Sequence, residues 1–289
     1  MKTLADFLYW TEEYFIANKL VFGHGTDNAW DEAVAIAMHV LHLSQDVSKD
    51  VLTRELLSNE KEALLDLVNR RVSECIPVPY LTNEAWFCGD RYYVDKRVII
   101  PRSPFAELIK NKFQPWVKVQ SVYNILDLCT GSGCIAIACA KAFPLAKVDA
   151  VDISQDVLDV TNYNIQQHKI EGRVHAVHSD LFQNLTEKKY DLIISNPPYV
   201  SAKEHYCLPH EYQHEPKLAL VSGSDGLDCT KEILNHAYDF LQPNGLLFVE
   251  VGNGWKILSS QYPSLPLQWL TFANGGEGVF MLTKDQLRN

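Results

Sequence analysis

Hydrophobic residues recur at helical spacing over the first part of the chain. Leu4, Phe7 and Phe15 fall on one helical face, and the same spacing returns over residues 30–41 and 64–72. Apolar side chains three and four positions apart form the buried stripe of an amphipathic helix. The pattern therefore predicts a small helical domain over residues 1–80, made of about three to five helices.

After this domain the pattern changes twice. Residues 81–104 are rich in aromatic and β-branched side chains around Gly89-Asp90, which predicts a β-hairpin linker. Beyond a bridging helix over 105–113, short apolar runs alternate with helical patterns, as in a parallel sheet with helices on both faces. Strands are expected at 123–129, 147–151, 174–178, 191–195, 246–251, 268–272 and 279–283, and helices at 134–142, 156–168 and 227–241. Residues 105–289 are thus expected to form an α/β, Rossmann-like domain. Its seven-stranded sheet should be mostly parallel, and its terminal strand should pair antiparallel with the preceding one.

Composition narrows the class of partner. The 289 residues carry a net charge of −10, from 36 acidic and 26 basic side chains, with no run of lysine and arginine. This balance disfavours direct recognition of nucleic acid and suits a basic protein partner. No apolar stretch is long enough for a membrane span, and acids at positions 6, 12 and 13 interrupt any signal peptide. We therefore expect a cytoplasmic protein whose seven cysteines, which include no C-x-x-C pair, are reduced and buried.

A glycine loop marks the candidate cofactor site. The first expected strand runs into Asp127-Leu128-Cys129-Thr130-Gly131-Ser132-Gly133, which together with Ala136 matches G-x-G-x-x-A. Asp152 ends the second strand, where an acid can bind ribose hydroxyls. These residues suit a nicotinamide cofactor or S-adenosylmethionine (SAM) equally well. Tight-turn glycines and an acid at a helix N-terminus are the simpler interpretation of each motif taken alone.

Two further acids favour SAM. The carboxylate of Asp127 is expected at the mouth of the loop, where a charge pair near 4 Å is worth about 4 kcal/mol. It would attract the ammonium and sulfonium groups of SAM and repel a pyrophosphate. Asp180 follows the third strand and can accept a hydrogen bond from an adenine amino group, while Phe182 offers an apolar wall. Three acids at consecutive strand ends therefore predict a crevice for SAM, and no metal is expected.

The sequence Asn196-Pro197-Pro198-Tyr199 after the fourth strand indicates the chemistry. Two successive prolines cannot extend a central strand, so they hold a rigid loop at its carboxyl end. The side-chain oxygen of Asn196 and the carbonyl of Pro197 can accept both hydrogens of a planar NH2 group, and Tyr199 can pack on its plane. Such a clamp suits methylation of an amide or amino nitrogen.

The glycine loop and this clamp together resemble the HemK/PrmC superfamily of SAM-dependent protein N(5)-glutamine methyltransferases over nearly the whole chain. The resemblance implies a class I methyltransferase fold, a helical N-terminal domain for substrate docking, and contacts to SAM and the substrate amide at Asn196. Release-factor enzymes of the superfamily usually carry PRPDTE after the hairpin. Here Pro101-Arg102-Ser103-Pro104-Phe105-Ala106-Glu107, with Phe22-Gly23-His24-Gly25-Thr26 and Glu250-Val251-Gly252-Asn253, is similar to the PrmB branch. The substrate of that branch is a glutamine in the third protein of the large ribosomal subunit.

Other functions remain open at this point. Release-factor glutamine methylation and methylation of an adenine amino group would use the same clamp, and a module that binds SAM only for folding would keep the loop. His210-Glu211-Tyr212-Gln213-His214 matches the zinc-protease pattern H-E-x-x-H, with Glu232 as a possible third ligand, but Pro209 and Pro216 leave little room for a helix. His24 and Arg102 suit either the substrate path or ordinary structural roles.

Overall fold

The computed structural model describes residues 1–44, 46–186, 188–273 and 275–288. The chain divides into two compact units. One comprises Met1–Ala85 together with Pro209–His214, and the other comprises Trp86–Leu208 and Glu215–Asn289. Among the described residues, no helix combines the length and the apolarity needed to cross a membrane.

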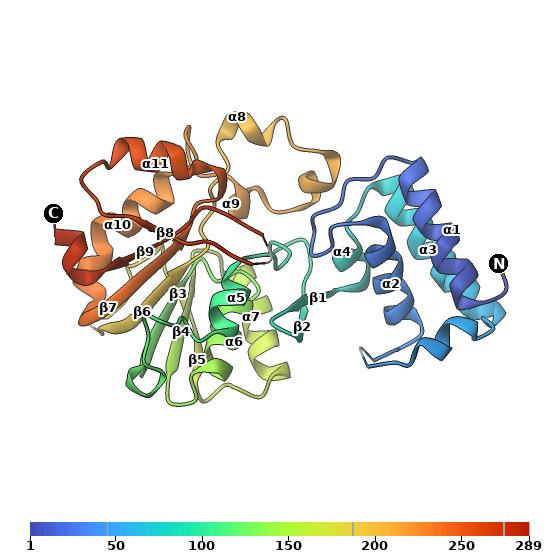
Figure 1. The fold of residues 1–289 in the computed structure, drawn as a ribbon, viewed down its shortest axis with the longest axis horizontal. Coiled ribbons are helices and arrows are strands. Elements are labelled where there is room, and N and C mark those ends of the chain that lie inside the picture. The colour runs from blue at the N-terminus through green and yellow to red at the C-terminus, as the bar shows by residue number, and fades with distance from the viewer. Residues whose placement is uncertain (45, 187, 274, 289) are drawn as a thin grey trace. The chain divides into compact units, whose positions relative to one another are not determined.

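The first unit is helical, as its hydrophobic spacing predicts (blue to cyan in Figure 1). It contains α1 (Leu4–Ala17), α2 (Ala29–Val40), a 3-10 turn η1 (Lys49–Thr53), α3 (Ser58–Glu74) and α4 (Val78–Thr82). Thr3 starts α1, because its side chain accepts from the backbone N–H of Asp6 while Asp6 accepts from that of Thr3. The apolar stripes of the helices meet in one core, where Phe7, Phe15 and Leu64 are fully buried.

Residues 209–214 belong to this helical unit although they lie far along the chain. They form a 3-10 turn, η3 (His210–His214). Glu211 accepts from the backbone N–H of Val21 at 2.8 Å and lies 3.5 Å from Arg71, which in turn donates to Glu32 at 2.8 Å. Arg71 and Glu32 are completely buried, and burial raises the pKa of the Glu32 carboxyl while Arg71 opposes the rise. One buried guanidinium therefore pairs with two carboxylates and holds the turn.

The second unit is built on the expected seven-stranded sheet. Its order is β5 (Val174–His178), β4 (Lys147–Asp152), β3 (Asn124–Leu128), β6 (Tyr190–Ser195), β7 (Leu241–Glu250), β9 (Val279–Thr283) and β8 (Gln268–Trp269). Neighbours from β5 to β7 pair parallel, whereas β9 pairs antiparallel with both β7 and β8. The prediction of a mostly parallel sheet that ends in an antiparallel strand is therefore confirmed.

Helices cover both faces of this sheet (Figure 1). Alternate strand residues point to opposite sides: Ile125 packs under α5 (Phe105–Lys110), α6 (Cys134–Ala142) and α7 (Gln155–Gln167), and Leu126 packs under α10 (Asp228–Phe240) and α11 (Trp255–Gln261). The remaining elements are short: α8 (Ala202–His205), α9 (Lys217–Leu220), η2 (Val119–Ser121), η4 (Gly252–Gly254) and η5 (Lys284–Arg288). Because β3, β4, β5 and β6 pair parallel, their carboxyl ends lie along one edge of the sheet.

Several boundaries differ from the sequence predictions. The strand expected from residue 246 begins at Leu241, because β6 and β7 already pair there, and a shift in register near Tyr190 accommodates the extra residues. The strand expected over 268–272 is only Gln268–Trp269, and the bridging helix ends at Lys110. The hairpin is present as β1 (Glu84–Phe87) and β2 (Asp90–Tyr93), with Cys88 and Gly89 at positive φ in its turn. All seven cysteines are free, but only Cys134 and Cys139 are buried.

Candidate active site

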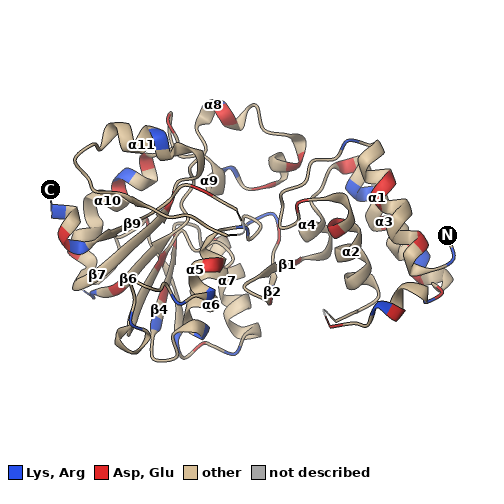
Figure 2. Ribbon diagram, in the orientation of Figure 1, with Lys and Arg blue, Asp and Glu red and all other residues tan. Residues whose placement is uncertain are grey.

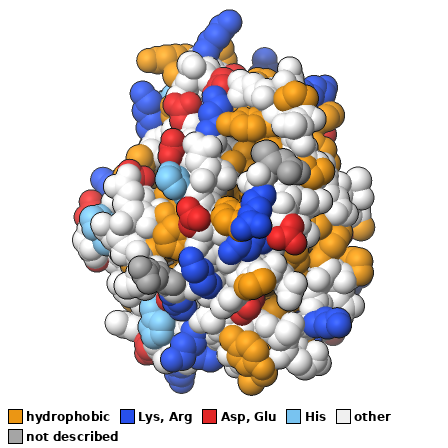
Figure 3. Space-filling model, turned by 90° about the vertical axis from the view of Figure 1, so that its left-hand side faces the viewer, with side chains coloured by type: hydrophobic (Ala, Val, Ile, Leu, Met, Phe, Trp, Pro, Cys, Tyr) orange, Lys and Arg blue, Asp and Glu red, His pale blue; other side chains and the backbone are white. Residues whose placement is uncertain are grey.

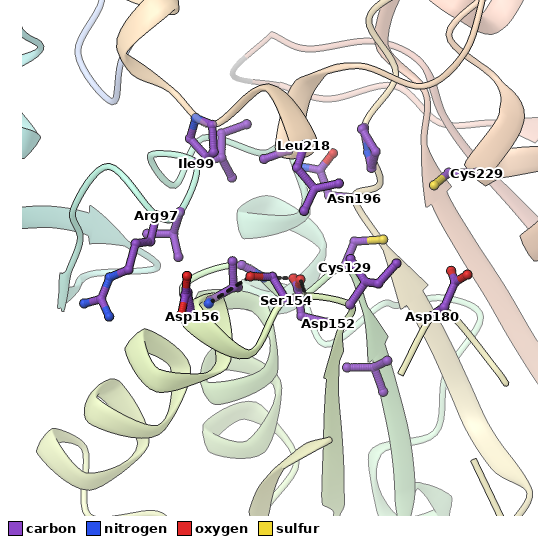
Figure 4. A pocket seen from close by; sticks show the side chains of 18 of the residues that line it. Arg97, Ile99, Cys129, Asp152, Ser154, Asp156, Asp180, Asn196, Leu218 and Cys229 are labelled. Carbon is purple, nitrogen blue, oxygen red and sulfur yellow. Dashed lines mark hydrogen bonds between the residues drawn. The ribbon is translucent and has the colours of Figure 1, made fainter. Parts of the chain in front are cut away.

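A cavity of about 350 Å³ lies at the carboxyl ends of the central strands, within the second unit (Figure 4). Four of the predicted residues line it: Gly131 after β3, Asp152 at the end of β4, Asp180 after β5, and Asn196 after β6. These residues come from four strands that are neighbours in the sheet but separated along the chain. The parallel order therefore assembles one site from four strand ends.

The glycine loop forms the floor of the cavity and is held by hydrogen bonds. The backbone N–H of Gly131 donates to Asp152 at 3.2 Å, and Thr161 Oγ1 donates to the carbonyl of Gly131 at 2.8 Å. Gly131 and Gly133 have φ of +57° and +80°, a region that disfavours side chains. A Cβ on Gly133 would also lie 2.9 Å from Thr161 Cγ2. The two glycines are therefore required by backbone conformation and, at Gly133, by packing against α7.

Asp152 is placed to bind a polar ligand group. Its two carboxylate oxygens accept from the backbone N–H groups of Gly131 and Ser154, and the half-buried side chain still faces the cavity (Figure 4). Burial raises the pKa of Asp152, whereas these backbone hydrogen bonds lower it. Each carboxylate oxygen retains further acceptor capacity, so the side chain can also bind hydroxyl groups of a ligand.

Asp127 lies beneath the loop rather than at its mouth. Its side chain is 1% exposed and accepts from Thr130 Oγ1 at 2.6 Å and from the backbone N–H of Ala136 at 3.1 Å. Burial raises the pKa of Asp127 to about 7. Thr130 and Ser132 are buried as well and do not line the cavity. The proposed attraction of Asp127 for a cationic cofactor therefore stays a prediction, and the contact made here is with the loop itself.

The segment after β5 presents different residues from those expected. Asp180 lines the cavity and accepts from Gln183 Nε2 at 3.0 Å. Phe182 does not line the cavity. It is buried against Phe240 of α10, with ring centroids 4.7 Å apart. Leu181 lines the cavity in its place, with φ of +45°. The turn rotates the chain, so the apolar wall comes one residue earlier than sequence spacing suggested.

The loop after β6 places Asn196 and Pro198 on the cavity, with the side chain of Asn196 directed into it (Figure 4). Pro197 is buried. Tyr199 stands outside the lining and donates its hydroxyl to Glu250 Oε1 at 3.1 Å. From this motif, Asn196 and Pro198 therefore face the same space as Gly131 and Asp152, and of these two only Asn196 offers a polar side chain.

Residues that sequence reasoning missed complete the walls. Ile99, from the segment after the hairpin, and Leu218, of α9, lie on the far side of the cavity from the strand ends (Figure 4). Arg102 fastens these two segments, since it donates to both oxygens of Glu215 at 2.6 Å, and Glu215 also accepts from the backbone N–H of Ile100. No local pattern in the sequence pairs Arg102 with Glu215, because the two residues lie 113 positions apart.

The lining favours a cationic, partly apolar ligand. Its acceptors are the carboxylates of Asp152, Asp156 and Asp180 and the amide oxygen of Asn196, whereas its one basic side chain, Arg97, is already paired with Asp95 at 2.6 Å. Net negative lining opposes a pyrophosphate and suits a ligand with positive charge. The residues present therefore fit SAM, as the sequence predicts.

The zinc-protease pattern forms no comparable site. Within the described parts of the chain, no three His, Cys, Asp or Glu side chains gather as a metal centre would require. Glu211 is committed to Val21 and Arg71, and His214 Nε2 lies 2.9 Å from the carbonyl of Glu74. The motif therefore serves the packing of a turn in the helical unit.

Comparison with known proteins identifies the group to which the chain belongs. Residues 113–257 match the family model "Methyltransferase small domain". The chain is 46% identical over 288 residues to a ribosomal protein uL3 glutamine methyltransferase of Francisella tularensis, which covers 99% of this chain and 92% of that protein. It is 48% identical to the protein of the same name from Neisseria gonorrhoeae, with coverage of 99% and 96%.

A solved structure supports the fold independently of close sequence similarity. The catalytic domain of hMettl16, in complex with the MAT2A 3′UTR hairpin 6, is similar with a TM-score of 0.53 at 12% identity, covering 82% of this chain and 86% of that one. At this identity the similarity concerns the fold alone. With the family model and the two relatives of nearly equal length, the chain belongs to the methyltransferase small domain family, together with the ribosomal protein uL3 glutamine methyltransferases.

Proposed function

We propose that this enzyme transfers a methyl group from SAM to the side-chain amide nitrogen of a glutamine in ribosomal protein uL3. Nearly full-length similarity to two uL3 glutamine methyltransferases supports the substrate. The observation that carries the chemistry is that Asn196 faces the same cavity as Gly131 and Asp152. An amide-binding side chain therefore stands beside the residues that fit the methyl donor.

The cofactor contacts follow from the lining. When bound, SAM supplies an electrophilic methyl group on a positively charged sulfur. Asp152 would accept from the ribose hydroxyls and Asp180 from the adenine amino group, with Leu181 as the apolar wall. Gly131 would lie against the cofactor with its backbone, because it has no side chain to occupy the space.

The substrate amide would be held by the loop after β6. Its two hydrogens would be accepted by Asn196 Oδ1 and the carbonyl of Pro197, and the ring of Tyr199 would pack on the amide plane. An amide nitrogen is a poor nucleophile, so orientation has to supply much of the rate. Holding the two reactants in the correct orientation can lower the activation free energy by up to about 7–11 kcal/mol. No strong base is required before attack, since the proton can leave after the methyl group has been transferred.

The helical unit is the proposed docking site for the substrate, because it carries most of the excess charge. Residues 1–85 and 209–214 contain seven lysines and arginines but fifteen aspartates and glutamates, so this unit holds eight of the ten excess negative charges. Figure 2 shows where the acidic residues lie along its helices α1, α2 and α3. On the face of the molecule in Figure 3, in contrast, basic and acidic side chains are interspersed. Long-range attraction would bring a basic protein to the acidic unit.

The outward face of α1 is the part of this unit best suited to contact. Tyr9 and Ile16 are each 61% exposed there, and Trp10 is 37% exposed and stacks on Tyr14. Glu13 lies between them on the same face. Exposed aromatic rings beside a carboxylate can receive lysine and arginine side chains through cation–π and ionic contacts.

A basic ribosomal protein as substrate also implies that the enzyme acts in the cytoplasm, with no need for a nucleic-acid or membrane surface.

Methyl transfer from labelled SAM to purified uL3, followed by mass spectrometry of the modified peptide, tests the proposal. The Asn196→Ala variant should lose about 10²-fold in kcat at saturating SAM, as expected for a misplaced reacting group. Asn111→Ala, which removes an exposed asparagine after α5, is the matched control and should retain activity. Labelling of a release factor or of RNA or DNA in preference to uL3 would contradict the proposed substrate, and full activity of Asn196→Ala would contradict the mechanism.

A further inference from the structure

Tyr199 is held at three points in the second unit. Its hydroxyl donates to Glu250 Oε1 at 3.1 Å. Its ring lies against Gly252, where a Cβ would come within 2.7 Å of the ring carbon Cε2, and its carbonyl oxygen would lie 2.3 Å from a Cβ on Gly226. Gly252 and the carboxylate of Glu250 therefore restrict the position of the ring, and Gly226 leaves room for the backbone carbonyl of Tyr199.

Glu250 connects Tyr199 to the segment before α5. It ends β7, is 4% exposed, and uses its second oxygen to accept from Ser103 Oγ at 2.6 Å. Ser103 Oγ also accepts from the backbone N–H of Phe105, so this hydroxyl is both a donor and an acceptor. The chain from Phe105 through Ser103 and Glu250 to Tyr199 spans residues that lie about 150 apart in the sequence.

The charges around this chain keep Tyr199 a donor. The carboxylate of Glu250 raises the pKa of Tyr199, so the phenol keeps its proton. Burial raises the pKa of Glu250 to about 7, and the hydrogen bonds from Ser103 and Tyr199 together with the charge of Arg102 oppose that rise. Glu215, which pairs with Arg102, is the remaining charged neighbour of Tyr199. Both oxygens of Glu250 are thus used by hydroxyl donors.

We propose that Ser103 and Glu250 are positioning residues that fix the ring of Tyr199 against the substrate amide. The inference rests on the proposed function, in which Tyr199 packs on the amide plane. None of Ser103, Tyr199 and Glu250 lines the cavity that fits SAM. Loss of the chain should therefore impair the methyl-transfer step and leave cofactor affinity unchanged, because an interaction used only in the transition state affects kcat.

The test compares Ser103→Ala, Ser103→Thr and Tyr199→Phe in methyl transfer to uL3. Ser103→Ala should lower kcat about tenfold, with the KM for uL3 and the Kd for SAM each within about twofold of the unchanged enzyme. Ser103→Thr keeps the hydroxyl and should restore most of the rate. The matched control is Ser259→Ala, which removes an equally half-buried serine hydroxyl that donates to a backbone carbonyl in α11. It should leave kcat unchanged.

A double-mutant cycle separates positioning from independent losses. If the hydroxyls of Ser103 and Tyr199 act through one carboxylate, the Ser103→Ala/Tyr199→Phe enzyme should be no slower than the slower single variant. Multiplicative losses, unchanged kcat in Ser103→Ala, equal impairment of Ser103→Ala and Ser103→Thr, or weaker SAM binding would each overturn the inference. Failure of the unchanged enzyme to methylate uL3 would instead overturn the proposed function, and the inference with it.

Discussion

The buried carboxyl of Asp127 should make the second unit less stable as the pH rises. Its pKa is about 7 in the folded protein, because burial outweighs the hydrogen bonds from Thr130 and Ala136, whereas an aspartate in water has a pKa of 3.8. Between these values the folded state retains a proton that the unfolded chain has released. The free energy of unfolding therefore falls as the pH rises through this window and levels off above about pH 7.

The size of the effect follows from the two pKa values. Each unit of difference corresponds to about 1.4 kcal/mol, so about three units give about 4 kcal/mol over the whole window and about 2–3 kcal/mol between pH 5 and pH 7. Asp127→Asn has no proton to release and should lose this part of the pH dependence. Glu250, whose pKa burial also raises to about 7, adds a slope that is the same in both proteins. The difference between the two pH profiles therefore reports Asp127.

Urea unfolding at pH 5, 6 and 7 measures the free energies. The stability difference between the unchanged protein and Asp127→Asn should change by about 2–3 kcal/mol from pH 5 to pH 7, in favour of the variant. Thr130→Val removes a hydrogen bond that lowers the pKa of Asp127, so this variant should steepen the loss. Parallel pH profiles for the unchanged protein and Asp127→Asn would refute the reasoning.

Two further predictions concern the loop and the docking surface. Gly133→Ala should destabilise the second unit by about 2–4 kcal/mol, from left-handed strain and contact with Thr161. Gly172→Ala, with open space around it, should cost less than about 0.5 kcal/mol in the same unfolding assay, and equal effects would contradict the packing argument. Raising NaCl from about 50 to about 300 mM should lower kcat/KM for uL3 about tenfold at constant SAM, because screening weakens long-range attraction to the acidic helical unit. A flat salt response would contradict steering.

Local hydrophobic patterns in the sequence were sufficient to predict a mostly parallel sheet. A parallel strand that is buried on both faces needs apolar residues at every position, so it is recognisable in the sequence as a short apolar run between turn signals. In the structure, Ile125 and Leu126 of such a run pack on opposite faces of the sheet. Gly131 and Asp152 were also found from sequence, since a tight strand-to-helix turn restricts residue type locally. The same holds for Asn196, which two prolines place at a strand end.

The sequence by itself thus determined the fold class, the strand ends that carry the site, and the residue types suited to SAM and to an amide. The tertiary structure decided which side chains reach the cavity. In the folded protein, Phe182 packs in the core against α10, and Asp127 lies beneath its loop. Glu211 pairs with Arg71 in the helical unit. The tertiary structure also linked Ser103 to Tyr199 through Glu250. These choices depend on burial and on partners far along the chain, and periodicity over a few residues contains no information about either.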